Sequence, residues 1–156
     1  KYNTFMDDIE DFKKSIGEKS RLLGIDPGKK RVGIAISDEN KLVSTPFKTI
    51  LKKNNTNVIN DILEIIREND IKGIVIGYPI NMDGSRGPSS QSAKDFAKNL
   101  SNNISLPILM WDERLSSQAA FNLSSNLDIN TSKKVKKLDQ NAASFILQGA
   151  IDYIKR

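Results

Sequence analysis

Acidic residues stand directly after two short apolar runs of the chain, where they could serve as catalytic bases or metal ligands. Asp26 follows the run 22–25, and Asp112 and Glu113 follow the run 107–111. A buried strand with an acid at its end presents that acid on a rigid element. Asp139, ahead of the last apolar pattern, could supply a further carboxylate.

The absence of His and Cys narrows the chemistry that these acids can support. With neither residue in the sequence, serine–histidine triads, thiol nucleophiles and imidazole or thiolate metal sites are excluded. Acid–base or metal chemistry must then use carboxylates, Lys or Tyr. A site of carboxylates alone suits Mg²⁺, or Mn²⁺, better than zinc.

The apolar periodicity predicts an α/β protein whose strands and helices would position these acids. The predicted strands cover residues 21–26, 31–37, 41–50, 73–77 and 107–111. The predicted helices cover residues 4–16, about 56–69, 93–100, a segment capped by Ser116 or Ser117, and a closing helix that starts near Asp139. Thr4 with Asp7 resembles a capping box, residues 78–91 read as a loop, and a linker containing Lys133, Lys134, Lys136 and Lys137 precedes Asp139.

The order of these elements predicts where the acids meet. If strands 21–26, 73–77 and 107–111 run parallel, their carboxyl ends lie side by side, and sites of open α/β sheets form beyond those ends. Asp26, Asp112 and Glu113 would then converge. Clustered carboxylates repel one another, and a divalent cation is their natural neutraliser here.

Each acid also has a purely structural interpretation. Asp26 could simply open the Pro27-Gly28 turn of a hairpin, and Asp112 and Glu113 could pair with Arg114. Asp139 could be a helix N-cap, and the lysines before it a solvated linker. The conjunction of acids at one edge of the sheet favours function over these alternatives.

Length and charge set broader limits. A chain of 156 residues with net charge +5 fits one domain and a polyanionic partner, although its abundance of Lys, Asn and Ile also fits a general basic bias. No apolar run approaches the roughly 18–20 residues that cross a membrane, and no signal peptide is visible. We therefore expect a cytoplasmic protein.

Four motifs, in order and at consistent spacing within residues 21–155, carry a family resemblance. They are Leu23–Ala35, Gly77–Gly84, Asp112–Ser117, and Asp139–Ala143 followed by Ile146–Gln148. Together they resemble the YqgF/RuvX group of RNase H-like nucleases, relatives of the RuvC Holliday junction resolvases. The resemblance implies an RNase H-like domain with a mixed five-stranded sheet flanked by helices, and a metal-dependent nuclease that hydrolyses phosphodiester bonds.

The resemblance also implies site residues. Asp26, Glu113 and Asp139 match the family's acids and would be the catalytic, metal-binding residues, holding one or two Mg²⁺ (or Mn²⁺) ions. Resolvases of the RuvC type carry a further acid at the end of the fourth strand, where this chain has Tyr78. As a hypothesis, cations around the crevice would hold substrate phosphates, namely Lys29, Lys30, Arg31, Arg86 and Arg114.

Several alternatives stay open at this point. The resemblance implies either maturation of the 5′ end of pre-16S ribosomal RNA or resolution of branched DNA, and an inactive nucleic-acid-binding module of the same fold is a further alternative. An actin-like ATPase would also use an Asp-X-Gly turn, but such folds need two domains of this kind. We expect residues 1–20 to be an N-terminal helical extension with a linker and residues 21–156 to be the nuclease domain, with a homodimer possible.

Overall fold

The computed structural model describes residues 5–6, 8–78, 87–113 and 131–155, and the side chains of these except at positions 5, 6, 89 and 131–140. Its strands are β1 (Phe5–Met6), β2 (Arg21–Pro27), β3 (Arg31–Ser37), β4 (Ser44–Leu51), β5 (Ile71–Tyr78) and β6 (Ile108–Asp112). Its helices are α1 (Ile9–Ile16), α2 (Asn55–Glu68), α3 (Pro88–Ser101) and α5 (Thr131–Ile154).

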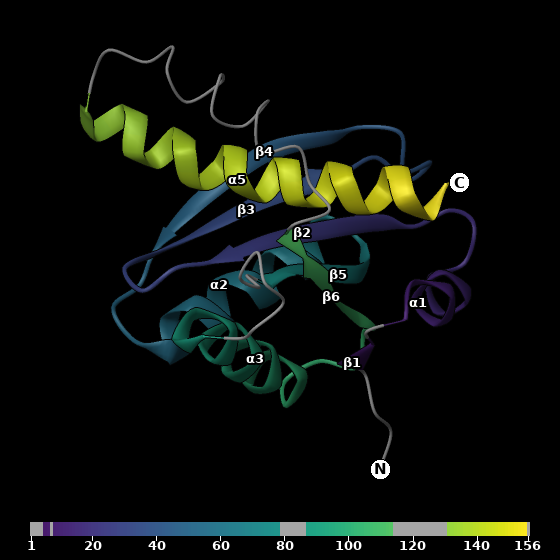
Figure 1. Ribbon diagram of the computed structural model, residues 1–156, viewed down its shortest axis with the longest axis horizontal. Coiled ribbons are helices and arrows are strands. Elements are labelled where there is room, and N and C mark those ends of the chain that lie inside the picture. Colours follow the sequence, from purple (N-terminus) through teal and green to yellow (C-terminus); the bar gives the residue numbers. More distant parts are fainter. Residues whose placement is uncertain (1–4, 7, 79–86, 114–130, 156) are drawn as a thin grey trace.

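A mixed sheet in the order β1-β6-β5-β2-β3-β4 forms the centre of the molecule (Figure 1). The pairs β2–β5 and β5–β6 are parallel, as predicted, whereas β3 pairs antiparallel with both β2 and β4. The five predicted strands are thus confirmed. The two-residue β1 extends the sheet beyond β6, with which it pairs in parallel.

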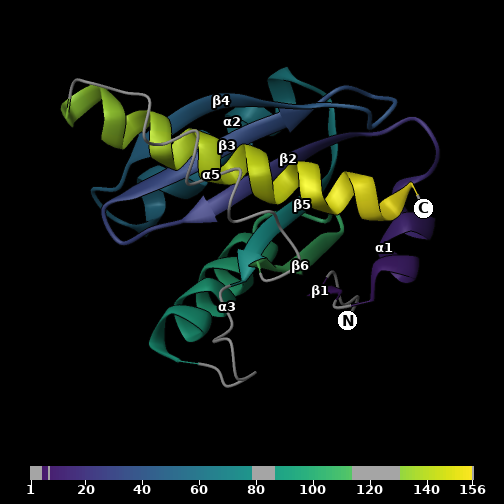
Figure 2. The same ribbon diagram turned by 45° about the horizontal axis from the view of Figure 1, so that its top comes forward.

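Helices cover both faces of the sheet (Figures 1 and 2). On one face, α2 and α3 bury apolar side chains such as Ile62 and Leu100 against β2, β3, β5 and β6. On the other face, α5 and α1 form a second core that contains Trp111, Leu147 and Phe12. Apolar residues at helical spacing on each helix account for both cores.

Helix α1 begins later than the sequence predicted. The expected helix 4–16 is shorter in the structure, because Asp8 is the N-cap and its carboxylate accepts a hydrogen bond from the Glu10 N–H at 2.9 Å. The proposed capping residues Thr4 and Asp7 lie outside the described residues. The helix packs on the core, since Phe12 is completely buried.

The third predicted strand, 41–50, also starts later, at Ser44. Residues 38–43 instead form a turn in which the Asp38 carboxylate accepts hydrogen bonds from the N–H groups of Leu42 (2.8 Å) and Val43 (3.0 Å). Pro46 lies on β4, which is an edge strand of the sheet, where a residue without an N–H is tolerated.

Helix α3 begins at Pro88, inside the segment predicted as a loop, because Pro is well suited to the first turn of a helix. The helix predicted after Ser116 or Ser117 lies outside the described residues. Within the described part of the chain, no helix combines the length and apolarity that crossing a membrane would require.

The start of the closing helix was predicted wrongly. Helix α5 begins at Thr131, so Lys133, Lys134, Lys136 and Lys137 belong to it rather than to a linker. Asp139 lies inside this helix and is not its N-cap. The four lysines suggest a solvated linker by composition. Lys is nevertheless a good helix former, so the same residues fit the first turns of a helix.

Candidate active site

The carboxyl ends of the three parallel strands lie together at one edge of the sheet. In β2 and β5, Ile25 pairs with Ile76, and at the ends of β5 and β6, Tyr78 pairs with Asp112. Asp26 follows Ile25 in β2, and Glu113 follows Asp112 directly. The predicted convergence of strand ends is therefore present.

A cleft of about 340 Å³ opens at this edge and brings Asp26 and Glu113 together. Residues from the β2–β3 turn, from the segment after β4, from α3 and from the end of β6 form its walls. The lining residues are Asp26, Pro27, Gly28, Lys29, Lys52, Ser92, Phe96 and Glu113. Two of the three predicted acids and one predicted cation thus share a single cleft.

Glu113 lies in an environment that disfavours its charge. Burial, and then the neighbouring Asp112 carboxylate, raise the pKa of Glu113 above its ordinary value. The backbone of Gly77 lies behind this side chain, since a Cβ built on Gly77 would be 3.2 Å from the Glu113 Oε2. A cation in the cleft would stabilise the ionised form of Glu113.

Helix α5 is held close to β2 beside the acids. A Cβ on Gly24 would lie 3.1 Å from the Ala143 carbonyl oxygen, so the helix backbone nearly touches the strand. Asp26 follows Gly24 by two residues, about 6.6 Å along a strand, and Asp139 precedes Ala143 by four residues, about 6 Å along a helix. Figure 1 shows α5 running antiparallel to β2, so both steps lead toward the carboxyl edge. The Asp139 side chain itself lies outside the described residues.

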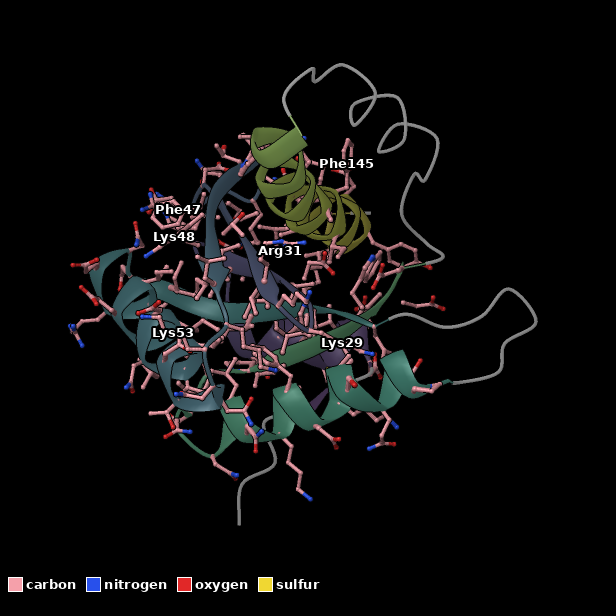
Figure 3. The ribbon with its side chains drawn as sticks, turned by 90° about the vertical axis from the view of Figure 1, so that its left-hand side faces the viewer. Lys29, Arg31, Phe47, Lys48, Lys53 and Phe145 are labelled. Carbon is pink, nitrogen blue, oxygen red and sulfur yellow. The ribbon has the colours of Figure 1, made fainter. Side chains whose placement is uncertain are left out.

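The predicted cations divide into two groups. Lys29 and Lys30 are exposed in the β2–β3 turn, and Arg31 is half-buried at the start of β3. Figure 3 shows Lys29, which lines the cleft, and Arg31 near the middle of the face that it presents. Arg86 and Arg114 lie outside the described residues, so their predicted phosphate contacts stay predictions.

Sequence reasoning missed Lys52 as a residue of the cleft. It follows β4, whose last residue Leu51 pairs with Arg31, and its N–H donates to the Lys30 carbonyl at 2.8 Å. The pairing register of β3 with β4 determines that Lys52 lies beside the cleft. That register depends on a bulge in β4 that the sequence does not reveal. Ser92 lies just before the predicted helix 93–100, whereas Phe96 lies inside it, where its apolar side chain indicates only a core position.

Tyr78 stands at the end of β5, the strand end at which the resemblance to resolvases implies a further acid. Its ring is buried at the end of β5, and the Lys94 Nζ of α3 lies 5.6 Å from the ring centroid. Tyr78 and Lys94 line a separate pocket with Gly87, Pro88, Ser90 and Gln91, so this strand end presents an aromatic ring and a cation rather than another carboxylate.

The oxygen donors of the cleft fit a hard divalent cation. Asp26 and Glu113 contribute carboxylates, and a bound cation would offset the burial and the Asp112 repulsion that raise the pKa of Glu113. Among the side chains that the structure describes, no three potential ligands form one group. Asp139, on the neighbouring part of α5, stays a prediction as the third ligand.

Solved structures identify the fold. The Thermus thermophilus RuvC structure superposes with a TM-score of 0.56 at 9% identity, over 85% of this chain and 95% of that one. RuvC from the same organism, in complex with a Holliday junction substrate, gives a TM-score of 0.58 at 10% identity, over 86% and 94%. At such low identity the likeness defines the fold, which is RNase H-like.

Sequence comparison identifies the family. The chain belongs to the RuvX family, whose model is described as Holliday junction resolvase and matches residues 20–153. A relative from Pelagibacter ubique (strain HTCC1062), provisionally named a pre-16S rRNA nuclease, is 56% identical over 94% of this chain and 97% of its own. A relative of the same name from Ruegeria sp. (strain TM1040) is 45% identical over 96% and 95%. The expected family and nuclease class are thereby confirmed.

Proposed function

We propose that this protein hydrolyses a phosphodiester bond in the precursor of 16S ribosomal RNA, in a reaction that depends on Mg²⁺ or Mn²⁺. The observation that carries the proposal is the meeting of Asp26 and Glu113 in one cleft whose wall includes Lys29 and Lys52. The names of the two relatives support the choice of substrate. Processing of ribosomal RNA would place the protein in the cytoplasm.

In this proposal Asp26, Glu113 and Asp139 hold one or two metal ions. When bound, a divalent ion would supply an activated water and stabilise charge on the leaving oxygen. Glu113 suits this role because burial and the Asp112 carboxylate raise its pKa, and a bound cation would offset both effects. Asp139 is included because α5 is held against β2 close to Asp26.

The remaining residues of the cleft would bind and orient the substrate. Lys29, on the β2–β3 turn, and Lys52, beyond β4, would contact phosphates on either side of the scissile bond. Lys30 and Arg31 would extend these contacts, as would Arg86 and Arg114. Phe96 and Ser92 form the α3 wall, which would limit the access of water on that side. Such positioning contributes to the rate by fixing the geometry of attack.

A second candidate is the resolution of four-way DNA junctions. The description of the family model and the RuvC complex with a Holliday junction favour it. A junction is symmetric, so this activity would call for two copies of the site and hence a homodimer. A chain that stays monomeric when it binds a junction would argue for the RNA substrate.

The experiment that separates these candidates offers the purified full chain two labelled substrates, a 16S precursor leader and a four-way junction. Each is incubated with Mg²⁺, with Mn²⁺ and with EDTA. Metal-dependent cleavage of the leader alone supports the proposal. Cleavage of the junction alone supports the second candidate, and salt-sensitive binding without cleavage of either would favour an inactive nucleic-acid-binding module.

A further inference from the structure

A basic surface extends from the cleft along the β3–β4 hairpin. We define the hairpin surface by six cations and one aromatic residue, namely Lys29, Lys30, Arg31, Phe47, Lys48, Lys52 and Lys53. The sequence holds no Asp or Glu between Asn40 and Asn60. This stretch of the hairpin and the link to α2 therefore carries charge of one sign, which suits a polyanion.

The hairpin surface is continuous with the cleft. Lys29 and Lys52 line the cleft themselves, and the Lys52 N–H donates to the Lys30 carbonyl at 2.8 Å. Lys53 follows directly and is exposed. From Lys52 back to Lys48 the chain covers four residues of β4, about 13 Å at the usual rise of a strand. A polymer bound in the cleft could reach Lys48 within a few monomer units.

Phe47 is the distinctive member of this surface. The ladder between β3 and β4 shifts register here: Ile34 pairs with Lys48 and Ala35 with Pro46, which leaves Phe47 as the extra residue. Its side chain is 46% exposed although it is large and apolar. Figure 3 shows Phe47 and Lys48 together on the outer side of the face on which Lys29 and Arg31 are central. An exposed aromatic ring among cations is a usual platform for an unpaired base.

The same features disfavour another protein strand as the occupant of this edge. Pro46 lacks an N–H, the bulge at Phe47 interrupts the ladder, and Lys48 adds charge, and all three hinder strand addition. The excess of cations would also repel a second copy of the chain at this edge.

We propose that the outer side of β4 binds a single-stranded segment of the nucleic acid whose scissile bond lies in the cleft. Phe47 stacks on an unpaired base, and Lys48, Lys52 and Lys53 contact the phosphates beside it. The inference rests on the proposed nuclease function only for the position of the scissile bond. It deepens that function by defining the substrate as one with an unpaired flank.

The test measures binding, so that it is independent of cleavage. A labelled hairpin with a blunt end is compared with the same hairpin carrying a single-stranded extension of about ten nucleotides, within the usual site size of such surfaces. Fluorescence anisotropy with the full chain in EDTA gives the gain in affinity from the extension. RNA and DNA versions of the extension determine which polymer the surface prefers, and a gain with either one supports the proposal.

Phe47→Ala should lower the affinity for the extended hairpin about tenfold, and so reduce the gain from the extension, while it leaves the affinity for the blunt hairpin unchanged. Phe47→Trp should restore the gain, because it keeps a stacking surface. Lys48→Ala should lower the salt dependence of binding for the extended probe alone, by about 0.7 in the log–log slope. Leu42→Ala is the matched control, since Leu42 is an apolar residue 62% exposed before the other end of β4.

Three results would overturn the inference: no gain from either extension, equal gain for Phe47→Ala and wild type, or a change in oligomeric state on sedimentation of Phe47→Ala. The proposed nuclease function is tested separately. An extension-dependent gain without any cleavage would sustain this inference while the nuclease proposal failed. If Phe47→Ala cleaved the extended substrate with the same KM as wild type, the nuclease proposal would be sustained and this inference would fail.

Discussion

Gly24 of β2 and Leu147 of α5 approach so closely that a Cβ on Gly24 would lie 2.7 Å from the Leu147 Cβ. The Ala143 carbonyl oxygen would lie at 3.1 Å from the same atom. Only a residue without a side chain allows this approach. Because Asp26 follows Gly24 by two residues, the contact fixes the distance between α5 and the strand that carries the central acid.

Gly24→Ala should therefore destabilise the protein and impair its site. Forcing a methyl group into this contact is expected to lower the free energy of unfolding by about 1–3 kcal/mol. It should also lower kcat at temperatures where the protein stays folded, since α5 must move away from β2. Thermal unfolding and single-turnover cleavage measure the two effects.

Gly73→Ala is the matched control for this variant. A Cβ on Gly73 would meet Ile16 Cγ2 at 2.7 Å, a similarly close contact, but under α1 and near the start of β5. It should lower the melting temperature while leaving kcat unchanged. If both variants lost kcat equally, the contact of Gly24 would have no special role in the site.

Glu113→Gln should abolish metal-dependent cleavage and stabilise the metal-free protein near neutral pH. The raised pKa of Glu113 means that its ionised form is less favourable in the folded chain than in the unfolded one. An amide of similar shape removes that unfavourable charge. Differential scanning fluorimetry in EDTA should show a higher melting temperature, where about 2–4 °C corresponds to 1 kcal/mol in a domain of this size. A lower melting temperature would mean that the Glu113 carboxylate is stabilised by another group.

The raised pKa of Glu113 also predicts how pH affects the binding of a metal ion. Below the raised pKa, Glu113 holds a proton that a divalent ion must displace, so affinity for the ion should fall as pH is lowered, starting above the ordinary range of a Glu. In the metal-free protein, Glu113 affects stability in the opposite direction. The free energy of unfolding decreases as pH rises from the pKa of Glu113 in the unfolded chain to its higher pKa in the folded chain. The increase in melting temperature caused by Mg²⁺ should therefore grow with pH. An increase independent of pH would contradict the assignment of Glu113 as a ligand.

Asp38→Ala tests the turn that precedes β4, away from the cleft. Hydrogen bonds from backbone N–H groups, that of Val43 above all, lower the pKa of Asp38, despite an opposing effect of burial. The Asp38 carboxylate stabilises the folded chain at any pH above its pKa in the unfolded chain. This stabilisation is lost as pH falls through the lower pKa that Asp38 has in the folded chain. We expect a loss of about 1 kcal/mol at neutral pH for this partly exposed group, with cleavage unaffected. Glu39→Ala, at an exposed neighbouring position, should change neither stability nor cleavage.

Local patterns were sufficient to predict the elements that bring the acids together. The apolar runs before Asp26 and Asp112 are strands, and their parallel order follows from the helices between them. The sequence alone therefore predicts that Asp26 and Glu113 lie at one edge of the sheet. Burial of these strands from both sides leaves a signal that a sequence carries plainly.

The remaining details depend on contacts that a local pattern does not encode. The two residues of β1 are too few to show a period, and they form a strand only because β6 offers an edge. Lys52 enters the cleft through a hairpin register that is shifted by the bulge at Phe47. The first turns of α5 are rich in Lys, and composition alone does not distinguish such a helix from a linker.

The most direct test of the proposed site is the rate of cleavage of a labelled 16S precursor leader by wild type and by Asp26→Asn, with Mg²⁺ and with EDTA. Circular dichroism controls for folding, and Asp61→Asn, at a half-buried position of α2 that does not line the cleft, is the matched control for loss of one carboxylate. Asp26→Asn should reduce the Mg²⁺-dependent rate by at least about 100-fold, as expected for a residue that holds the catalytic ion, while Asp61→Asn keeps it. A folded Asp26→Asn protein that cleaves at the wild-type rate would contradict the proposed site.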